Sequence, residues 1–291
     1  MNRAPNKDTT KKKNEFLFFA LRNTKLRIGV SIILFFIILA FVGPLLTPNP
    51  PLDYIGPANA PPQADYWFGT TTFGQDVFSQ FVHSLIPLFL VGIIGGGLAT
   101  FLGMLIGFFA GYRGGIIDEI LNMLTNIALV IPTFAVLLII AAYLEVRGII
   151  VESIFIGLTA WPWTARAVRA QTFSLKAREF VELAKISGVK STKIILLEIA
   201  PNMLSYLVMA FILQFGGAIL AAATLDFIGL GPTEGISMGL MMNNAVLWGA
   251  LQLGIWWWFV PPGLAIALIV GALYITNVGL DEVFNPKLRE M

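Results

Sequence analysis

Arg178-Glu179-Phe180-Val181-Glu182-Leu183-Ala184-Lys185-Ile186-Ser187-Gly188 opens a charged segment that continues to Ile199-Ala200-Pro201-Asn202. Strongly apolar runs lie on both sides of this segment. A long polar loop is unusual in so apolar a chain, and nothing in the loop itself explains its length. We therefore expect that another protein recognises it.

The composition is that of a membrane protein. Of the 291 residues, 57% are hydrophobic and only 12% are charged, and the mean hydropathy is +0.79. Soluble domains carry about 25% charged residues. Several apolar runs reach the roughly 20 residues that a helix needs to cross a bilayer. The sequence thus predicts an all-α polytopic protein of the cell membrane with six transmembrane helices.

Several function classes are excluded by the residues that are missing. The chain has no cysteine, so it has no disulfide, no thiolate nucleophile and no cysteine metal site. His83 is the only histidine. The net charge of +2 gives no reason to expect nucleic acid as a partner. We expect no catalytic residue, no metal ligand and no cofactor in this chain.

The expected spans are separated by polar or proline-rich segments. The first apolar run is too long for a cleavable signal, so we interpret it as a retained helix. Residues 1–27 form a basic tail, of which Phe16–Leu21 is either a surface helix or part of an unstructured leader. Pro132 predicts a kink in the third span. The six spans are expected at 28–46, 85–110, 121–143, 149–163, 203–230 and 255–275.

This pattern divides the chain into five parts. They are a cytoplasmic tail (1–27), a first helix (28–46), an extracytoplasmic loop (47–84), a domain of five helices (85–277) and a C-terminal tail (278–291). Within the large domain, the charged loop is expected over 165–202. A short, partly apolar helix is expected at 240–251.

The distribution of positive charge predicts the orientation. If the N-terminus is cytoplasmic, every Lys and Arg except Arg147 falls in a cytoplasmic segment. Cytoplasmic loops are enriched in Lys and Arg, so both termini and the charged loop are predicted to be cytoplasmic. The same count supports the short fourth span, because without it the charged loop would lie outside.

Few residues inside the spans could carry chemistry. Glu152 and Asp226 lie near the outer ends of their spans, and we do not expect them to form a pair. The scarcity of buried charge argues against an ion-coupled carrier. The run Gly188-Val189-Lys190-Ser191-Thr192 ends like a phosphate-binding loop, but it has Val189 where that loop requires glycine. We therefore expect that the chain does not bind ATP itself.

Two sets of residues predict packing. Gly103, Gly107 and Gly111 form consecutive small-xxx-small repeats, which allow two helices to approach closely. In the charged segment, Phe180, Val181, Ala184 and Gly188 share one helical face, and Gly188 is suited to a helix C-terminus. The alternative for this segment is an amphipathic loop that lies on anionic lipid.

The charged segment resembles a known motif. Glu182-Leu183-Ala184, three residues, Gly188 and then Ile199-Ala200-Pro201-Asn202 are similar to the EAA loop of permease subunits of ATP-binding-cassette (ABC) importers. Leu183 and Ala200 depart mildly from it. Other segments resemble the C-type permeases of the dipeptide, oligopeptide and nickel branch: Phe68-Gly69-Thr70, Phe73–Ser79, Gly111–Gly115, Ile131-Pro132, Phe227–Gly231, Pro262-Gly263 and Asn277–Arg289.

The resemblance implies a type I importer permease fold. It implies a homologous second permease, two ABC ATPase subunits that bind ATP and Mg, and an extracytoplasmic substrate-binding protein as partners. Phe180–Gly188 would then be the coupling helix. The residues implied in ATPase coupling are Phe180, Val181, Glu182, Leu183, Ala184, Gly188, Ile199 and Pro201.

The substrate stays open among peptides, oligosaccharides and nickel complexes. Two further alternatives are a permease of another ABC branch and a membrane carrier outside the ABC class.

Overall fold

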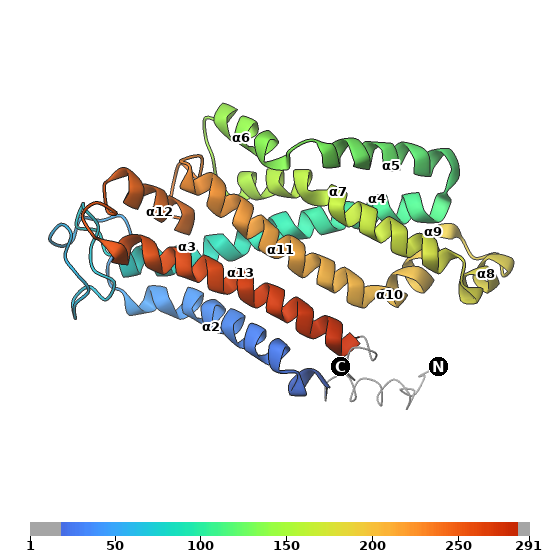
Figure 1. Cartoon of the computed structure of the whole chain (residues 1–291), viewed down its shortest axis with the longest axis horizontal. Helices are drawn as coiled ribbons and strands as arrows, with labels where there is room; N and C mark the ends of the chain where they lie inside the picture. The colour runs from blue at the N-terminus through green and yellow to red at the C-terminus, as the bar shows by residue number, and fades with distance from the viewer. Residues whose placement is uncertain (1–18, 285–291) are drawn as a thin grey trace.

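A computed structural model describes residues 19–284, and this part of the chain is built from helices (Figure 1). Within it, β pairing is limited to two isolated bridges, Gln63–Tyr66 and Thr70–Asp76. The all-α fold class is confirmed. In chain order, the elements are α2 (Thr24–Leu46), α3 (Val77–Val91), the π-helix η1 (Gly92–Gly96), α4 (Gly97–Arg113), α5 (Gly115–Val130), α6 (Thr133–Tyr143), α7 (Ile149–Lys176), α8 (Glu179–Ile186), α9 (Ser191–Ile194), the π-helix η2 (Ile195–Ile199), α10 (Ala200–Asn202), α11 (Leu204–Phe227), α12 (Met238–Leu247) and α13 (Trp256–Phe284).

The long helices run back and forth along one axis (Figure 1). Among the described residues, α2, the continuous α3–η1–α4 rod, α11 and α13 are long and apolar enough to cross a membrane. The α5–α6 pair makes a fifth span if its two parts count as one. The expected fourth span, α7, has 28 residues but carries Arg166 and Arg169 in its second half. The count of six spans and the sides of the termini stay predictions.

Two expected boundaries near the N-terminus are wrong because polar side chains cap the helices earlier. The first span begins at Thr24 rather than 28, since Asn23 accepts a hydrogen bond from the backbone N–H of Leu26. The second begins at Val77 rather than 85, since Asp76 accepts from Phe78 and Ser79. The outer loop therefore ends at residue 76, not 84.

Two helices also extend further at their C-terminal ends than predicted. The charged loop expected from 165 begins as a continuation of α7, which stays helical to Lys176 while Val168 and Thr172 pack on α4. The C-terminal tail expected from 278 is helical to Phe284. Gly279 contacts the backbone of Leu26, which fixes the end of α13 against the start of α2. The predictions for residues 1–18 of the basic tail and for residues 285–291 lie outside the residues that the structure describes.

Pro132 produces a break rather than the expected kink. The axes of α5 and α6 differ by 75° across residues 131 and 132. Ile131 is extended (ψ 124°), as expected before proline, whose ring disfavours the α conformation of the preceding residue. The third span is thus made of two helices.

Three glycines set the most extensive helix–helix contact among the described residues, between α4 and α7. A β-carbon at Gly103 would lie 2.5 Å from the Thr164 side chain, and one at Gly107 would lie 2.7 Å from the Ala165 carbonyl oxygen. A β-carbon at Gly111 would lie 2.7 Å from the Arg169 carbonyl oxygen. Because no side chain fits between them, the two backbones touch along three helical turns.

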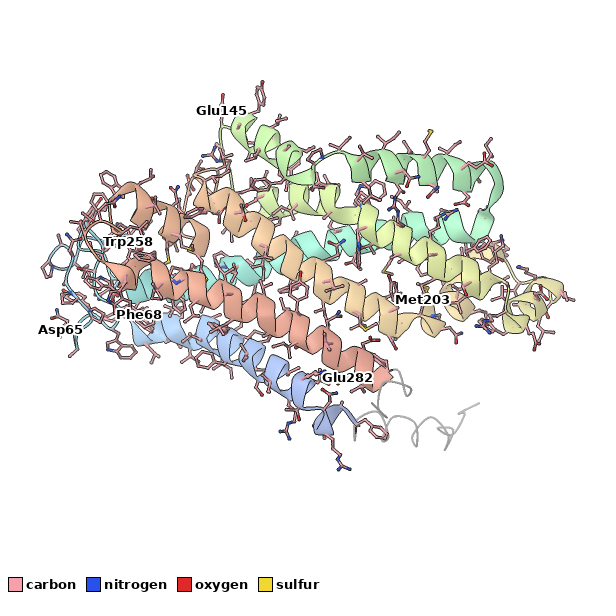
Figure 2. All side chains as sticks on the ribbon, viewed as in Figure 1. Asp65, Phe68, Glu145, Met203, Trp258 and Glu282 are labelled. Carbon is pink, nitrogen blue, oxygen red and sulfur yellow. The ribbon has the colours of Figure 1, made fainter. Side chains whose placement is uncertain are left out.

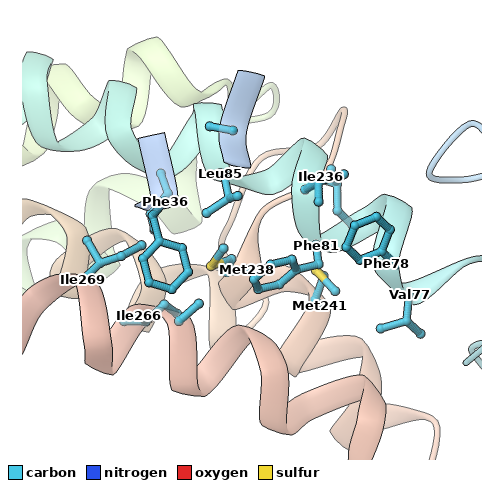
Figure 3. Close-up of a cluster of buried hydrophobic side chains, with 14 of the residues drawn as sticks. Phe36, Val77, Phe78, Phe81, Leu85, Ile236, Met238, Met241, Ile266 and Ile269 are labelled. Carbon is cyan, nitrogen blue, oxygen red and sulfur yellow. The ribbon is translucent and has the colours of Figure 1, made fainter. Parts of the chain in front are cut away.

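The largest apolar core lies towards the outer end of the bundle (Figure 3). Phe36 of α2 packs between Ile266 and Ile269 of α13, and the side chains of α3 and α12 close the other side. Figure 2 places Phe68 and Trp258 at this end and Glu282 at the other end of α13. The Trp257 indole donates a hydrogen bond to the Thr70 carbonyl, which joins the outer loop to α13.

Candidate functional site

The charged segment folds into a short helix, α8, at the end of the molecule opposite the outer loop (Figure 1). Arg178 precedes it in extended conformation, and Gly188 ends it with φ +73°. The backbone N–H of Val189 donates to the Ala184 carbonyl, which closes the C-terminal turn. The left-handed conformation of Gly188 turns the chain sharply towards α9.

One face of α8 points into the protein. Val181 is completely buried, and Phe180 and Ala184 are half-buried against the apolar cluster to which Val181 belongs, which also includes Phe108 and Tyr112 of α4. Ile199 of η2 is buried in the same cluster. Val181 and Ile199 are among the residues that the resemblance implies in ATPase coupling, and that role stays a prediction. Both are buried, so within this chain they support α8.

The opposite face of α8 is exposed and partly apolar. Leu183 is 65% exposed and Ile186 is 85% exposed. Glu179 and Glu182 are exposed beside them. Ile186 was missed in the sequence, although its spacing of three from Leu183 puts both residues on one helical face. Two neighbouring apolar side chains surrounded by charge form a surface typical of a protein contact.

Pro201 lies apart from this surface. It is exposed at the beginning of the α10 turn, between η2 and α11. Its place indicates a role in the chain path rather than in contact with a partner. Proline at the first turn of a helix costs no backbone hydrogen bond.

Two lysines link the end of α7 and α8 to the end of α4. The Nζ atoms of Lys176, at the end of α7, and Lys185, in α8, each lie 5.9 Å from the centre of the Tyr112 ring. This distance allows a cation–π attraction on both. The coupling helix candidate is thus connected to α4 and α7 by side chains, and to α11 through α9, η2 and α10.

An ion pair joins α5 to α7 close to the same end. The Arg169 guanidinium donates from Nε to one Asp118 carboxylate oxygen at 2.5 Å and from an Nη atom to the other at 2.7 Å. Such two-pronged pairs fix orientation as well as distance. The ion pair therefore fixes the beginning of α5, next to the turn after α4, against the second half of α7, the helix that leads into α8.

We expect Arg169→Ala to lower the stability of the protein by about 1–2 kcal/mol, because Asp118 loses both charged donors. The measurement is the thermal unfolding of the purified protein. The double variant Asp118→Ala with Arg169→Ala should recover part of this loss, since it leaves no unpaired carboxylate. A double variant that is less stable than Arg169→Ala would contradict this account.

We expect Gly188→Val to destabilise the end of α8 by about 1–2 kcal/mol, since a branched residue is strained at positive φ. A β-carbon at Gly188 meets no atom within 4 Å, so crowding plays no part. The measurement is the rate of limited proteolysis after Lys185 and Lys190. Gly188→Asn, which tolerates this conformation better, should be cut more slowly than Gly188→Val. Equal rates for both variants would count against the strain.

Glu152 of α7 and Asp226 of α11, which we did not expect to form a pair, line the same small cavity together with Ser237. One carboxylate oxygen of each is buried without a hydrogen-bond partner among the described residues. Ser237, which caps α12, donates to Asp226 at 2.5 Å. These three residues line one small cavity and so join three helices at the outer end. Their separation in sequence gave no signal of this shared cavity.

The described residues contain no group of three or more His, Asp or Glu side chains that could hold a metal ion. The features that stand out are the exposed face of α8 and the rigid support behind it. Comparison with known proteins identifies what such a chain is.

A family model described as the inner membrane component of binding-protein-dependent transport systems matches residues 103–290. The chain belongs to this family. The matched region begins at Gly103 in α4 and includes the whole of α8, so the features described above lie within the family's shared part.

Relatives of the family extend the match over almost the whole chain. The dipeptide transport system permease protein of Bacillus subtilis is 31% identical over 92% of this chain and 84% of its own length. That of Alkalihalophilus pseudofirmus is 33% identical over 94% and 89%. The oligopeptide transport system permease protein of Bacillus subtilis is 30% identical over 92% and 88%.

The family and the apolar helices together make this chain a multi-pass protein of the cell membrane. It is the membrane component of a transport system that depends on a binding protein. The alternative of a carrier outside this class is wrong.

Proposed function

We propose that this chain is a permease subunit of an ATP-driven peptide importer, in which it forms half of the pathway together with a homologous second permease. The support is its family and the names of its relatives, which are dipeptide and oligopeptide permeases. None of the three relatives named above is an oligosaccharide or nickel permease.

The proposed mechanism rests on one observation: α8 has an exposed apolar face and an opposite face that is buried in the protein. Its outer face presents Leu183 and Ile186, and its inner face is anchored through Val181. An ATPase subunit that binds the exposed face would therefore move α8 together with the apolar cluster on which it packs. α8 follows α7 directly and leads to α11, so a displacement of α8 reaches two long helices.

ATP and Mg are bound and used by the ATPase partners in this proposal. The permease contributes no catalytic residue. When the ATPase subunits close on ATP, rigid-body movement of α7 and α11 alternates the pathway between its outward and inward states. The substrate-binding protein delivers peptide at the outer end, where the loop 47–76 and α12 lie.

A test of the substrate uses the complete transport complex in proteoliposomes. We expect ATP-dependent uptake of radiolabelled di- to pentapeptides when the cognate binding protein is present, and no uptake without it. Nickel complexes and oligosaccharides serve as the comparison substrates. Uptake of one of these without any peptide uptake would overturn the peptide assignment while leaving the permease function intact.

A test of the partners is co-purification from the native membrane. A tagged form of this chain should recover a second permease and ABC ATPase subunits. If neither is recovered under conditions that keep this chain folded, the ATP-driven mechanism is wrong.

A further inference from the structure

Two carboxyl groups line one small cavity that lies where α3, α7, α11 and α12 meet. Glu152 comes from the first turn of α7, and Asp226 comes from the end of α11. The cavity has a volume of about 10 Å³, which is room for one water molecule at most. Apart from Ser84 and Ser237, the other lining residues are apolar or glycine. The two carboxyl groups thus share a narrow and mostly apolar space.

Each carboxyl group has a buried oxygen without a hydrogen-bond partner. Asp226 is 4% exposed, and its Oδ1 atom is buried and unpaired among the described residues. The Oε1 atom of Glu152 is buried and unpaired as well. An ionised carboxylate can only accept hydrogen bonds, so two ionised carboxylates cannot satisfy each other. Burial of a charge without a partner is costly, so the site is unfavourable for two anions.

No basic side chain pairs with these carboxyl groups in the described part of the chain, where the ion pairs join other residues. Arg147 is a candidate, because it lines a neighbouring cavity together with Glu152. Its guanidinium donates instead to the backbone carbonyl oxygens of Gly231 and Ala141. Arg147 therefore fixes the loop after α11 and leaves the carboxyl groups without a countercharge.

The other elements around the cavity bring no countercharge either. The helices α3, η1, α6 and α12 contain no Asp, Glu, Lys or Arg. His83 of α3 has its Nδ1 atom hydrogen-bonded to the Ser79 carbonyl oxygen. Glu145 and Glu234, in the adjoining loops, are exposed and do not line the cavity. Two like charges in so small a space repel each other, which favours the neutral form of one of them.

The surroundings favour the charge on Asp226 and the proton on Glu152. The Ser237 hydroxyl donates to Oδ2 of Asp226 at 2.5 Å, and it accepts from the backbone N–H of Leu240 at the start of α12. The first turn of α12 packs on Asp226, since a β-carbon at Gly239 would lie 2.5 Å from the Asp226 Cβ atom. A helix N-terminus carries partial positive charge and stabilises a carboxylate beside it.

We propose that Glu152 and Asp226 form a site that binds one proton, which Glu152 carries and donates to Oδ1 of Asp226, directly or through one water molecule. A protonated carboxyl group is a donor as well as an acceptor. One proton therefore gives a partner to both unpaired oxygens and removes the repulsion between them.

The bound proton joins the beginning of α7 to the end of α11. The other ends of these two helices are connected through α8, α9, η2 and α10. The proton site is thus a second link between the same two helices. This inference does not depend on the proposed transport mechanism.

The test is infrared spectroscopy of the full-length protein in dodecyl maltoside, a detergent without carbonyl groups. At about pH 7, exposed carboxyl groups with pKa values of about 4 are ionised. A carboxylic acid C=O band at this pH therefore reports a retained proton. We expect one such band, which moves to lower frequency in D₂O.

The variants identify the carrier of the proton. Glu152→Gln should lose the acid band, whereas the matched control Glu145→Gln, at an exposed position just before α7, should keep it. Asp226→Asn should keep the band but move it to higher frequency, because an amide oxygen is a weaker acceptor than a carboxylate.

Thermal unfolding gives a second readout. If the folded protein holds a proton that the unfolded chain releases, the unfolding equilibrium constant rises by up to about tenfold per pH unit. We expect the melting temperature of the unmodified protein to fall relative to that of Glu152→Gln between about pH 6 and about pH 8, where an unfolded glutamate is ionised. Glu145→Gln should follow the unmodified protein.

Two results would overturn the proposal. One is an acid band of equal intensity in the unmodified protein and in Glu152→Gln. The other is stabilisation by sodium chloride but not by choline chloride that disappears in Glu152→Gln, which would show that a cation balances two ionised carboxylates. If Glu152→Gln does not accumulate, the unmodified protein decides the matter, because the lack of any acid band at about pH 7 rejects the proton site.

Discussion

Gly107→Val is expected to abolish accumulation of the folded permease. A β-carbon at this position would lie 2.7 Å from the Ala165 carbonyl oxygen and 2.7 Å from the Val168 side chain, both on α7. Valine adds two further carbons, so α4 and α7 must separate. Overpacking of this kind costs about 3 kcal/mol, a factor of about 100 in the folding equilibrium. The measurement is the amount of monodisperse protein recovered from membranes.

The control comes from the same helix. A β-carbon at Gly97 has a single neighbour, the Phe211 ring at 3.9 Å, which is an ordinary contact distance. Gly97→Val should therefore accumulate almost normally, and Gly107→Ala should lie between the two. Wild-type yield and melting temperature for Gly107→Val would mean that α4 and α7 do not pack as described.

Ile186→Asp is expected to reduce transport to background while the permease stays folded. The side chain is 85% exposed, so a charge there costs the isolated permease almost nothing. At a desolvated interface, loss of an apolar anchor costs about 2 kcal/mol or more, at least roughly 30-fold in affinity. The measurements are peptide uptake and the recovery of ATPase subunits with the tagged permease.

Two companion variants separate coupling from folding. Ile186→Leu keeps the apolar surface and should retain uptake. Val181→Asp places a charge in a completely buried position, so it should lower the yield of folded permease itself. If Ile186→Asp still recovers its ATPase subunits and transports normally, the outer face of α8 is not the coupling surface.

The helices could be predicted because the signals for them are local. An apolar run of about 20 residues is costly anywhere but in a membrane or a core. Pro132 favours an extended Ile131 and so ends α5, although Pro87 and Pro162 lie inside continuous helices. The helix ends were less accurate: α3 begins eight residues before the predicted boundary at 85, because the capping carboxylate of Asp76 outweighs the hydropathy of the residues after it.

The candidate site was predicted only in part, for a reason visible in α8. Helical periodicity placed Phe180, Val181 and Ala184 on one face, and they do share it. Periodicity does not say whether that face points inwards, and the cluster around Tyr112 buries it. The exposed face with Ile186 was consequently overlooked, and the burial of Val181 could not be foreseen.

The sequence by itself determined the membrane environment, the class of fold and the position of the charged segment in the chain. Composition, helical periodicity and charge bias can each be read from residues that are neighbours in the chain. Only the tertiary structure decided that Glu152 and Asp226 line one cavity, that Ile186 faces outwards and that α2 leaves a groove beside α13. Each of these depends on how helices far apart in the chain are placed together. That placement is set by close contacts such as the one between Gly43 and Val82. Neither residue, taken alone in the sequence, predicts that contact.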